Sequence, residues 1–339
     1  MADTLMLLSG GHPVHRKFGE AVGAGLFQLP VLAAKSQFLP LKGLNLLRAA
    51  LSVPSGHPYL LCESAYFYPA LKRRMHLLGK SKIININGGP ILHHILTGRV
   101  RGFEAQMLLD LLREVDGHLV YGTFGVDLLH KVGVTGKPIR IIYPFIRSDS
   151  LSRFLTIEPS LDSHRICIIA TSDGYNKGLD ILFKALAFVQ KSFPDATVDL
   201  VTRMDETEIV SIEGYDAARV NICKGVKDLG VVLSKAALYV QPSRSDMFAV
   251  SCLEAMAVGV PCIVSNETGA REVVEKVGAN MVVLLDENKL ASAITRYFRL
   301  SSQERSALSK RSREAAKFFN EKDMSVRFKN EFEALKKEA

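Results

Sequence analysis

The amino-acid sequence predicts an α/β protein with two doubly wound parallel sheets. The chain has 339 residues, which exceeds one ordinary hydrophobic core and favours two domains of about 150 residues each. Short β-branched runs alternate with amphipathic segments over most of this length, as in parallel sheets with helical crossovers. Hydrophobic residues make up 47% and charged residues 23%, so the chain is expected to be folded and soluble, not disordered or fibrous.

The first half of the chain shows this alternation in a loose form. Strands are predicted at residues 4–8, 59–62, 82–86, 118–121 and 139–142. The longest apolar stretch, Ala21–Ala34, contains Gln28 and Pro30 and is too short to span a membrane. We expect it to form a buried helix or an interfacial segment near Phe27 and Phe38.

The second half shows the alternation more regularly. Strands are predicted at residues 165–170, 196–202, 220–223, 238–241 and 262–264. Helices are predicted between them at residues 178–193, 206–213, 227–236, 247–258 and 270–277. This order predicts a second doubly wound sheet.

The boundary between the two domains is predicted near Ser150. The stretch 143–163 contains Pro144 and Pro159 and has the turn-rich composition of a linker. The predicted domains are therefore 1–150 and 151–300, followed by two packed helices in the charged segment 301–339. Because ligands of such sheets bind at the carboxyl ends of the strands, the expected active site is a cleft between the domains.

The net positive charge lies entirely in the first half. Residues 1–150 contain 17 Lys and Arg against 9 Asp and Glu, whereas the remaining residues contain 26 of each. Eight of the nine histidines also lie in the first half. This half is expected to meet an anionic partner, such as a phosphate-bearing acceptor, an acidic membrane surface or a polyanion; ordinary solubilising charge is the alternative.

The cysteines and the apolar runs indicate a reducing, cytoplasmic location. The five cysteines form no CxxC pair, and most lie in or beside apolar runs, as buried thiols do. There is no uncharged apolar run of 18 residues, and Met1–Leu8 lacks the basic region of a signal peptide. Secretion and membrane spanning are therefore not expected.

The run from Gln241 to Pro261 carries the strongest chemical signal. A strand leads into a polar turn that contains Asp246, and a helix is predicted to open at about Met247. The backbone N–H groups of Met247, Phe248 and Ala249 would then form an anion site that accepts a diphosphate.

A second carboxylate follows at a suitable spacing. Glu254 lies eight residues after Asp246, about 12 Å along a helix axis. This separation suits the two ends of a sugar nucleotide, with one acid on the sugar and the other on the ribose. The alternative is that Asp246 only caps the helix and Glu254 is a solvated helix residue.

These segments resemble the family-4 retaining glycosyltransferases, which are GT-B enzymes with two Rossmann-like domains facing across a cleft. The resemblance covers about residues 115–285. Its residues are Pro242, Ser243, Asp246, Phe248, Glu254 to Ala257, Gly259, Pro261, Gly269, Glu272 and Val273, with Asn176 to Asp180, Val220 to Gly225, Val115 to His118 and Ile139 to Pro144.

The resemblance implies roles for individual residues. Lys177 would contact the donor diphosphate, Glu254 the ribose and Asp246 the transferred sugar. Gly269 would line the same pocket because a close approach to ligand leaves no room for a side chain. In the first domain, the Gly10-Gly11 loop after the first strand would bring backbone amides to the donor phosphates or the acceptor.

The sequence departs from the family pattern at three sites. Asp246 stands where the family usually has Glu, and Thr171 and Ser172 where it often has Arg, so Arg244, Arg203 or Lys224 would have to replace that phosphate partner. Asn87 stands where many members have a histidine that faces the transferred sugar, and His93 and His94 follow shortly after.

The resemblance implies transfer of a sugar from a nucleoside diphosphate sugar to an acceptor hydroxyl with retention of configuration. The 1–150 domain would bind a glycan, lipid or small-molecule acceptor, and the 151–300 domain the donor. No required divalent metal ion is expected, because no Asp-x-Asp motif is present. No cofactor and no nucleic acid partner are expected either. By its charge, Lys72-Arg73-Arg74 would offer peripheral contact with the anionic inner face of the membrane; a solvated surface is the alternative. A GT-B sugar-nucleotide epimerase and a non-catalytic sugar-nucleotide sensor remain alternatives.

Overall fold

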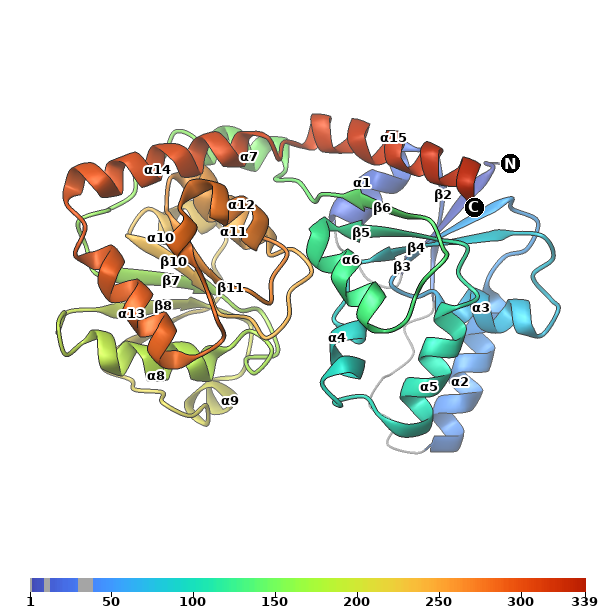
Figure 1. Cartoon of the computed structure of the whole chain (residues 1–339), viewed down its shortest axis with the longest axis horizontal. Helices are drawn as coiled ribbons and strands as arrows, with labels where there is room; N and C mark the ends of the chain where they lie inside the picture. The colour runs from blue at the N-terminus through green and yellow to red at the C-terminus, as the bar shows by residue number, and fades with distance from the viewer. Residues whose placement is uncertain (1, 9–12, 30–38) are drawn as a thin grey trace. The chain divides into compact units, whose positions relative to one another are not determined.

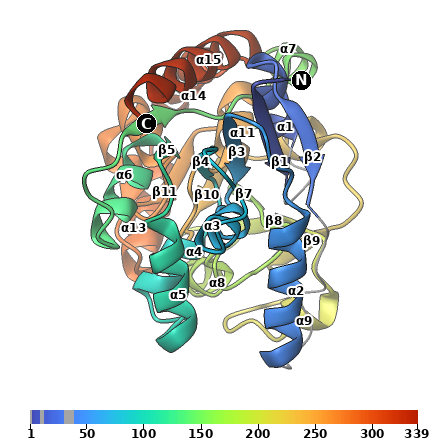
Figure 2. The same ribbon diagram turned by 90° about the vertical axis from the view of Figure 1, so that its right-hand side faces the viewer.

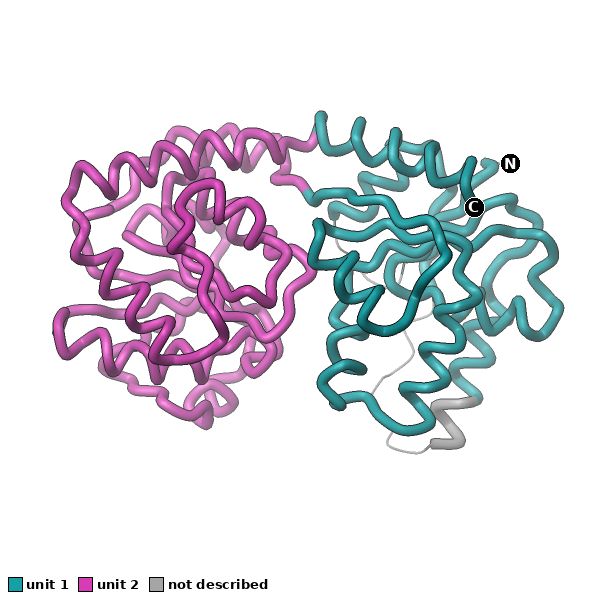
Figure 3. The backbone as a smooth tube through the Cα atoms, viewed as in Figure 1, with its two compact units in different colours: residues 1–144, 322–339 teal, residues 145–321 magenta. Residues whose placement is uncertain are grey.

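The chain folds into two compact units (Figures 1 and 3). A computed structural model describes residues 2–8, 13–29 and 39–339. Unit 1 comprises residues 1–144 and 322–339, and unit 2 comprises residues 145–321. The chain thus leaves unit 1 after Pro144, earlier than the predicted boundary near Ser150. The two C-terminal helices, predicted as one segment, are divided: α14 (Ser302–Lys317) belongs to unit 2 and α15 (Glu321–Glu338) almost entirely to unit 1.

Unit 1 contains a six-stranded parallel sheet in the order β2-β1-β3-β4-β5-β6. The strands are β1 (Thr4–Leu8), β2 (Gly25–Gln28), β3 (Tyr59–Glu63), β4 (Lys82–Asn87), β5 (Gly117–Tyr121) and β6 (Ile139–Ile142). The prediction of a helix or interfacial segment over Ala21–Ala34 was wrong where it can be compared, because Gly25–Gln28 pairs with β1 as an edge strand. Four residues at a sheet edge give too short an alternation to stand out in a long apolar run. Residues 30–34 and Phe38 lie outside the described residues.

Helices cover both faces of this sheet. They are α1 (Pro13–Ala21), α2 (Leu39–Ser52), α3 (Phe67–Arg74), α4 (Ile91–Leu96), α5 (Gly102–Leu112) and α6 (Gly122–Lys131). Figures 1 and 2 show α1 and α15 together over one face, with α2, α3 and α5 over the other. The Phe18 ring of α1 stacks on Phe328 of α15 with centroids 4.1 Å apart. Because Phe328, Phe332 and Leu335 are fully buried, hydrophobic burial fixes α15 to unit 1.

Unit 2 contains a second six-stranded parallel sheet in the order β12-β11-β10-β7-β8-β9. The strands are β7 (Arg165–Ile169), β8 (Thr197–Val201), β9 (Val220–Cys223), β10 (Leu238–Gln241), β11 (Cys262–Ser265) and β12 (Val282–Val283). The helices are α7 (Ser148–Phe154), α8 (Leu179–Val189), α9 (Glu206–Val210), α10 (Leu229–Leu233), α11 (Val250–Val258), α12 (Arg271–Val277), α13 (Glu287–Phe298) and α14, with a short 3-10 turn at Ala279–Met281. The two-residue strand β12 was not predicted.

Each sheet contains one point at which the strand order reverses. In unit 1 the chain runs outward from β1 to β2 and then returns to place β3 on the other side of β1. In unit 2 it runs from β7 to β9 and then returns to place β10 beside β7. Ligands of doubly wound sheets bind at the carboxyl ends of the strands at such points. The loops after β1 and β3, and those after β7 and β10, are therefore the places to search for function.

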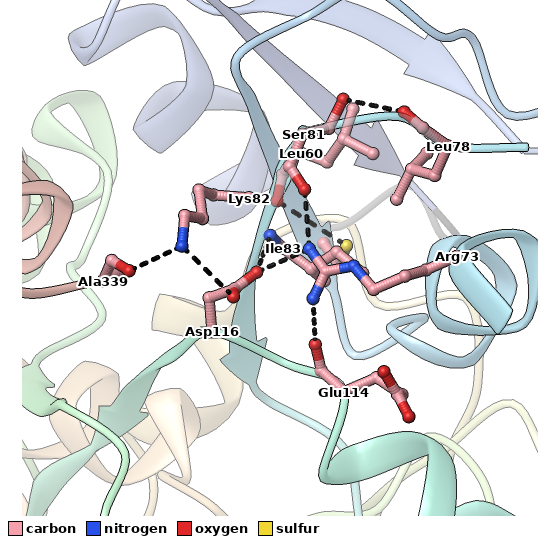
Figure 4. Close-up of polar contacts among 10 residues, drawn as sticks. Leu60, Arg73, Leu78, Ser81, Lys82, Ile83, Glu114, Asp116 and Ala339 are labelled. Atoms are coloured by element: carbon pink, nitrogen blue, oxygen red, sulfur yellow. Dashed lines mark hydrogen bonds and ion pairs between the residues drawn. The ribbon is translucent and has the colours of Figure 1, made fainter. Parts of the chain in front are cut away.

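The basic run Lys72-Arg73-Arg74 forms hydrogen bonds within unit 1. Lys72 is buried and its ammonium group donates to the carbonyl oxygen of Val53. The guanidinium group of Arg73 donates to the Ser81 carbonyl oxygen and to the Asp116 carboxylate, both at 2.6 Å (Figure 4). These groups were predicted to touch an anionic membrane. That prediction was wrong for Lys72 and Arg73, because their side chains donate hydrogen bonds inside unit 1, at the amino ends of the strands.

No helix in the described part of the chain is long and apolar enough to cross a membrane.

Candidate functional site

Three loops meet at the strand-order reversal of unit 2. They follow β7, β10 and β11, and backbone contacts join them directly. Asn176 of the first loop donates from its side chain to the Ser245 carbonyl oxygen of the second at 2.9 Å. The Gly269 N–H of the third loop donates to the Asp246 carbonyl oxygen at 2.9 Å. These contacts place all three loops in one rigid cluster at the carboxyl edge of the sheet.

Two glycines allow the loops to approach so closely. A Cβ atom on Gly178 would lie 1.9 Å from the Pro242 carbonyl oxygen, and the φ of Gly178 is +70°. A Cβ atom on Gly269 would lie 2.0 Å from the Met247 carbonyl oxygen. We predicted that glycine is required at position 269 because a ligand approaches closely there. In the structure, the close neighbour is instead the backbone of Met247.

Lys177 and Asp246 form an ion pair within this cluster. Nζ of Lys177 lies 2.5 Å from Oδ2 of Asp246, and both side chains are partly buried. Burial lowers the pKa of Lys177, but the charge of Asp246 and its hydrogen bond outweigh burial and raise that pKa overall. The ammonium group therefore stays charged. The residues predicted to hold the diphosphate and the sugar thus lie in contact, although they are 69 positions apart in sequence.

The helix after Asp246 begins later than predicted. It was expected to open at Met247, but α11 begins at Val250 with Ala249 as its N-cap. Asp246 forms an isolated parallel β-bridge with Thr268 in the loop after β10. Met247, Phe248 and Ala249 follow in this loop and are buried. The prediction that their N–H groups form the first turn was wrong; that turn starts at Val250.

Glu254 lies on the second turn of α11 and is partly buried. Burial raises the pKa of this carboxyl group from 4.5 to about 7. None of the described residues donates a hydrogen bond to this carboxylate or forms an ion pair with it. Removing a carboxylate from water without a partner is costly. Glu254 is therefore not the solvated helix residue of the alternative interpretation.

Buried hydroxyl groups in the same loops also lack partners. Oγ of Ser245 and Oγ1 of Thr268 are buried and have no hydrogen-bond partner among the residues that the structure describes. Buried polar side chains are nearly always hydrogen-bonded in folded proteins. Two such hydroxyls beside the Lys177–Asp246 pair are typical of a site built for a polar ligand.

Arg244, Arg203 and Lys224, which would have to replace the missing phosphate partner, differ in their exposure and in their existing contacts. Arg244 makes two hydrogen bonds to the Asp180 carboxylate, at 2.8 and 2.7 Å, and its guanidinium lies 3.8 Å from the Tyr175 ring centroid. It serves to hold the loop after β7 against the loop after β10. Thr171, Arg203 and Lys224 are exposed. Gly10 and Gly11, predicted to bind phosphate, lie outside the described residues.

In unit 1, Asn87 points into a buried polar chain. Its Oδ1 accepts from Nδ2 of Asn85 at 2.8 Å, and its Nδ2 lies 3.3 Å from Nδ1 of His118. Burial, with Lys137 as a second cause, lowers the pKa of His118 to about 4. The side chain of Asn87, predicted to occupy the place of a histidine that faces the transferred sugar, is thus hydrogen-bonded in the interior of unit 1. His93 and His94 are partly exposed on α4.

A histidine–carboxylate pair in unit 1 was not predicted from the sequence. His15 in the first turn of α1 donates from Nδ1 to Glu63, the last residue of β3, and both are buried. A signal was present, since Glu63 is an acid at the end of an apolar strand and His15 follows the first strand. Only the sheet order brings them together, across 48 positions of sequence.

The comparisons with known proteins agree with this architecture. The family model described as "Glycosyl transferases group 1" matches residues 163–299, which include all three loops of the cluster. No curated protein sequence matches the chain.

Solved structures match nearly the whole chain. Sucrose-phosphate synthase from Thermosynechococcus elongatus aligns with a TM-score of 0.72 at 18% identity and covers 99% of both chains. Anabaena HepE, solved with UDP and glucose, aligns with a TM-score of 0.67 at 14% identity over 98% of this chain and 99% of the other. Staphylococcus aureus TarM aligns with a TM-score of 0.62 at 12% identity over 81% of this chain and 55% of the other. The fold is therefore GT-B, as predicted.

Proposed function

We propose that this protein is a glycosyltransferase that moves a sugar from a nucleoside diphosphate sugar to an acceptor hydroxyl. The observation that carries the proposal is the loop cluster of unit 2. It joins the Lys177 ammonium group, the Asp246 carboxylate and two unpartnered hydroxyls at the strand-order reversal of a doubly wound sheet, and Glu254 lies on the helix that follows the loop after β10. The segment matched by the glycosyltransferase family model contains all of these groups, and structures with similar folds were solved with UDP and glucose.

The donor would bind by exchanging the internal ion pair for contacts with the ligand. Lys177 would turn from Asp246 to the diphosphate, whose charge is larger and whose oxygens accept charge-assisted hydrogen bonds. Asp246 would then accept hydrogen bonds from hydroxyls of the transferred sugar. The first-turn N–H groups of α11 would contribute to the same anion site.

Glu254 would bind the ribose of the nucleotide. Two ribose hydroxyls can both donate to one ionised carboxylate, which accepts only in that form. Because burial raises the pKa of Glu254 to about 7, ribose binding would favour the ionised form and release a proton near neutral pH. The buried carboxylate would thereby exchange an unfavourable environment for two strong hydrogen bonds.

We further propose that the reaction proceeds with retention, as in the family-4 enzymes that the sequence resembles. No enzymic nucleophile stands out in the loop cluster, so the leaving diphosphate would accept the proton of the attacking hydroxyl on the same face of the sugar. The protein would then act by positioning the reactants and stabilising charge on the leaving group. No metal and no organic cofactor enter this scheme.

The acceptor would bind to unit 1. The net positive charge lies entirely in residues 1–150, which suits a phosphate-bearing glycan, lipid or small molecule. Cytoplasmic location with peripheral contact to an anionic membrane stays part of the proposal. Because the side chains of Lys72 and Arg73 form hydrogen bonds inside unit 1, other cationic side chains would have to contact the membrane.

The direct test is ligand-induced stabilisation followed by product analysis. UDP, GDP, ADP and their sugars are titrated into the protein while its thermal unfolding is followed, because a ligand of the folded state raises the apparent stability. We expect one nucleotide to be selected and its shift at a given concentration to be smaller in Lys177→Met. No shift with any nucleotide would contradict the proposal.

Product analysis then separates the remaining alternatives. NMR of the product reports the anomeric configuration and so tests retention. Interconversion of the donor sugar without any acceptor would identify an epimerase. Donor binding without turnover across an acceptor panel would identify a non-catalytic sensor.

A further inference from the structure

A groove lies at the amino ends of β3 and β4 in unit 1. Its two walls are residues 55–59, which lead into β3, and residues 77–82, which lead into β4. Its volume is about 620 Å³, within the range of small-molecule sites. The ligand position expected for a doubly wound sheet is at the carboxyl ends of the strands. This amino-edge groove is therefore separate from the place at which an acceptor would bind.

Hydrogen bonds join the two walls of the amino-edge groove. Oγ of Ser55 donates to the carbonyl oxygen of Leu77 at 3.2 Å. The N–H of Lys82 donates to the carbonyl oxygen of Pro58 at 2.8 Å. Each bond runs from one wall to the other, so the width of the groove is set by the fold of unit 1. A ligand would therefore meet a site that is already formed, and binding would not have to order these loops.

The charge of the amino-edge groove is positive. The residues that line it include Lys80 and Lys82 and no acid. Lys80 is exposed and forms an ion pair with none of the described residues. Nζ of Lys82 lies 3.7 Å from Oδ1 of Asp116 and donates to the Ala339 carbonyl oxygen at 2.9 Å (Figure 4). Because Asp116 also accepts a hydrogen bond from Arg73 at 2.6 Å, one carboxylate faces two cations and leaves part of the positive charge unbalanced.

The turn at Gly79 adds backbone donors to these cations. The φ of Gly79 is +72°, and a Cβ atom there would meet nothing within 4 Å. The N–H groups of Gly79 and Lys80 donate to no acceptor among the described residues. Successive N–H groups at a left-handed turn can bind an anion. Pro58 and Leu77 add apolar surface on the two walls, so the groove suits an anionic group that is attached to a small organic body.

We propose that the amino-edge groove binds the phosphate group of a water-soluble phosphorylated molecule. Lys80 and Lys82 supply the positive charge, and the turn at Gly79 supplies the N–H donors. A phosphate group carries more charge than a carboxylate and has three strong acceptor oxygens, so it can bond to both ammonium groups and to the turn at once. No bond of the ligand is made or broken. The inference does not depend on the proposed glycosyl transfer, because neither donor nor acceptor is expected at this edge of the sheet.

The first experiment locates phosphate on the protein. Inorganic phosphate and glycerol 3-phosphate are titrated into ¹⁵N-labelled protein at constant ionic strength, with glycerol as the neutral probe, and the backbone amide resonances are followed. We expect saturable shifts of the Gly79 and Lys80 amides with both phosphates and none with glycerol. Phosphate can also meet the loop cluster of unit 2, so the amides that shift identify the site. No shift at Gly79 and Lys80, or shifts confined to the loop cluster, would overturn the proposal.

The second experiment compares two variants that lose the same charge. Lys80→Gln removes a charge from the groove, and Lys131→Gln removes one from the exposed end of α6, elsewhere in unit 1. We expect the Kd for glycerol 3-phosphate to rise about 10-fold in Lys80→Gln and to stay near the wild-type value in Lys131→Gln, since salt screens a distant charge. The melting temperature of the free protein should not change in either variant. Equal Kd values in the two variants would refute the proposed contact with Lys80.

A third measurement distinguishes a soluble ligand from a lipid headgroup. Wild type and Lys80→Gln are mixed with phosphatidylcholine vesicles that contain or lack phosphatidic acid, and the bound protein is measured by sedimentation. We expect Lys80→Gln to weaken binding of glycerol 3-phosphate without changing the amount of protein on either kind of vesicle. Binding to phosphatidic acid vesicles that requires Lys80, with no response to glycerol 3-phosphate, would overturn the proposal.

The outcomes separate this inference from the proposed function. If the wild type binds no nucleotide, the glycosyltransferase assignment fails, whereas phosphate-induced shifts at Gly79 and Lys80 would still support the groove. If the wild type binds a nucleotide and transfers sugar but shows no response to phosphate at Gly79 and Lys80, the groove proposal fails and the assignment stands.

Discussion

Replacing Glu254 by Gln should stabilise the free protein and weaken nucleotide binding at the same time. The carboxyl group has a pKa of about 7 in the folded protein against 4.5 as its ordinary value, and burial is the cause. A folded-state pKa above the unfolded one means that the folded protein holds this proton more tightly. The contribution of Glu254 to stability is therefore fully present below pH 4.5 and is lost as the pH rises through 7.

The size of this effect follows from the shift. Each unit of pKa corresponds to about 1.4 kcal/mol, so ionising Glu254 costs the folded state up to about 3 kcal/mol at pH 8. Partial exposure of the side chain makes this an upper limit. Gln has the same shape and no charge, so Glu254→Gln should match the wild type near pH 4.5 and exceed it by as much as that amount at pH 8. For a unit of this size, the melting temperature would rise by several degrees.

The assay follows thermal and urea unfolding of both proteins from pH 4.5 to 8.5. Glu275→Gln is the matched control, because Glu275 is an exposed acid on the neighbouring helix α12. The same variants are titrated with the selected nucleotide, whose affinity for the wild type should rise with pH between 5.5 and 8. A stability difference between Glu254→Gln and wild type that does not change with pH would refute the reasoning. Undiminished nucleotide affinity in this variant would refute the ribose role.

Three further predictions concern other groups. Lys177→Met should lower nucleotide affinity at least about 10-fold and destabilise the free protein, because Asp246 loses its partner; calorimetric titration and melting measure both, and unchanged affinity would exclude the phosphate role. The folded-state pKa of His118 is lowered to about 4. The neutral imidazole therefore contributes to the free energy of unfolding above pH 6.5, and this contribution should fall by up to about 3 kcal/mol as the pH drops to 4. His118→Asn should flatten this dependence in acid unfolding curves, and a wild-type curve already flat over that range would contradict it. Gly178→Ala should cost about 3 kcal/mol or more, since its Cβ would meet the Pro242 carbonyl oxygen; Gly225→Ala, also at positive φ but in open space, should cost only about 1 kcal/mol in the same denaturation assay.

The sequence by itself determined the architecture of both units and the location of the loop cluster. Five strands in each half were predicted where β1, β3 to β6 and β7 to β11 lie. They could be predicted because the sequence of a doubly wound sheet alternates clearly between apolar strands and amphipathic helices. The turn after β10 could be identified because strand, acid and helix follow one another within a few residues. The short edge strands β2 and β12 were not predicted, because a few residues at a sheet edge are too few to show an alternation of apolar and polar side chains.

Tertiary structure alone decided which side chains meet. The contact of Lys177 with Asp246 spans 69 positions, and that of His15 with Glu63 spans 48; both depend on strand order, which local patterns do not encode. The start of α11 at Val250 depends on the bridge between Asp246 and Thr268, a contact invisible in a helical periodicity. The burial that raises the pKa of Glu254 is likewise a property of packing, because a sequence gives the identity of a charge and only the fold gives its surroundings.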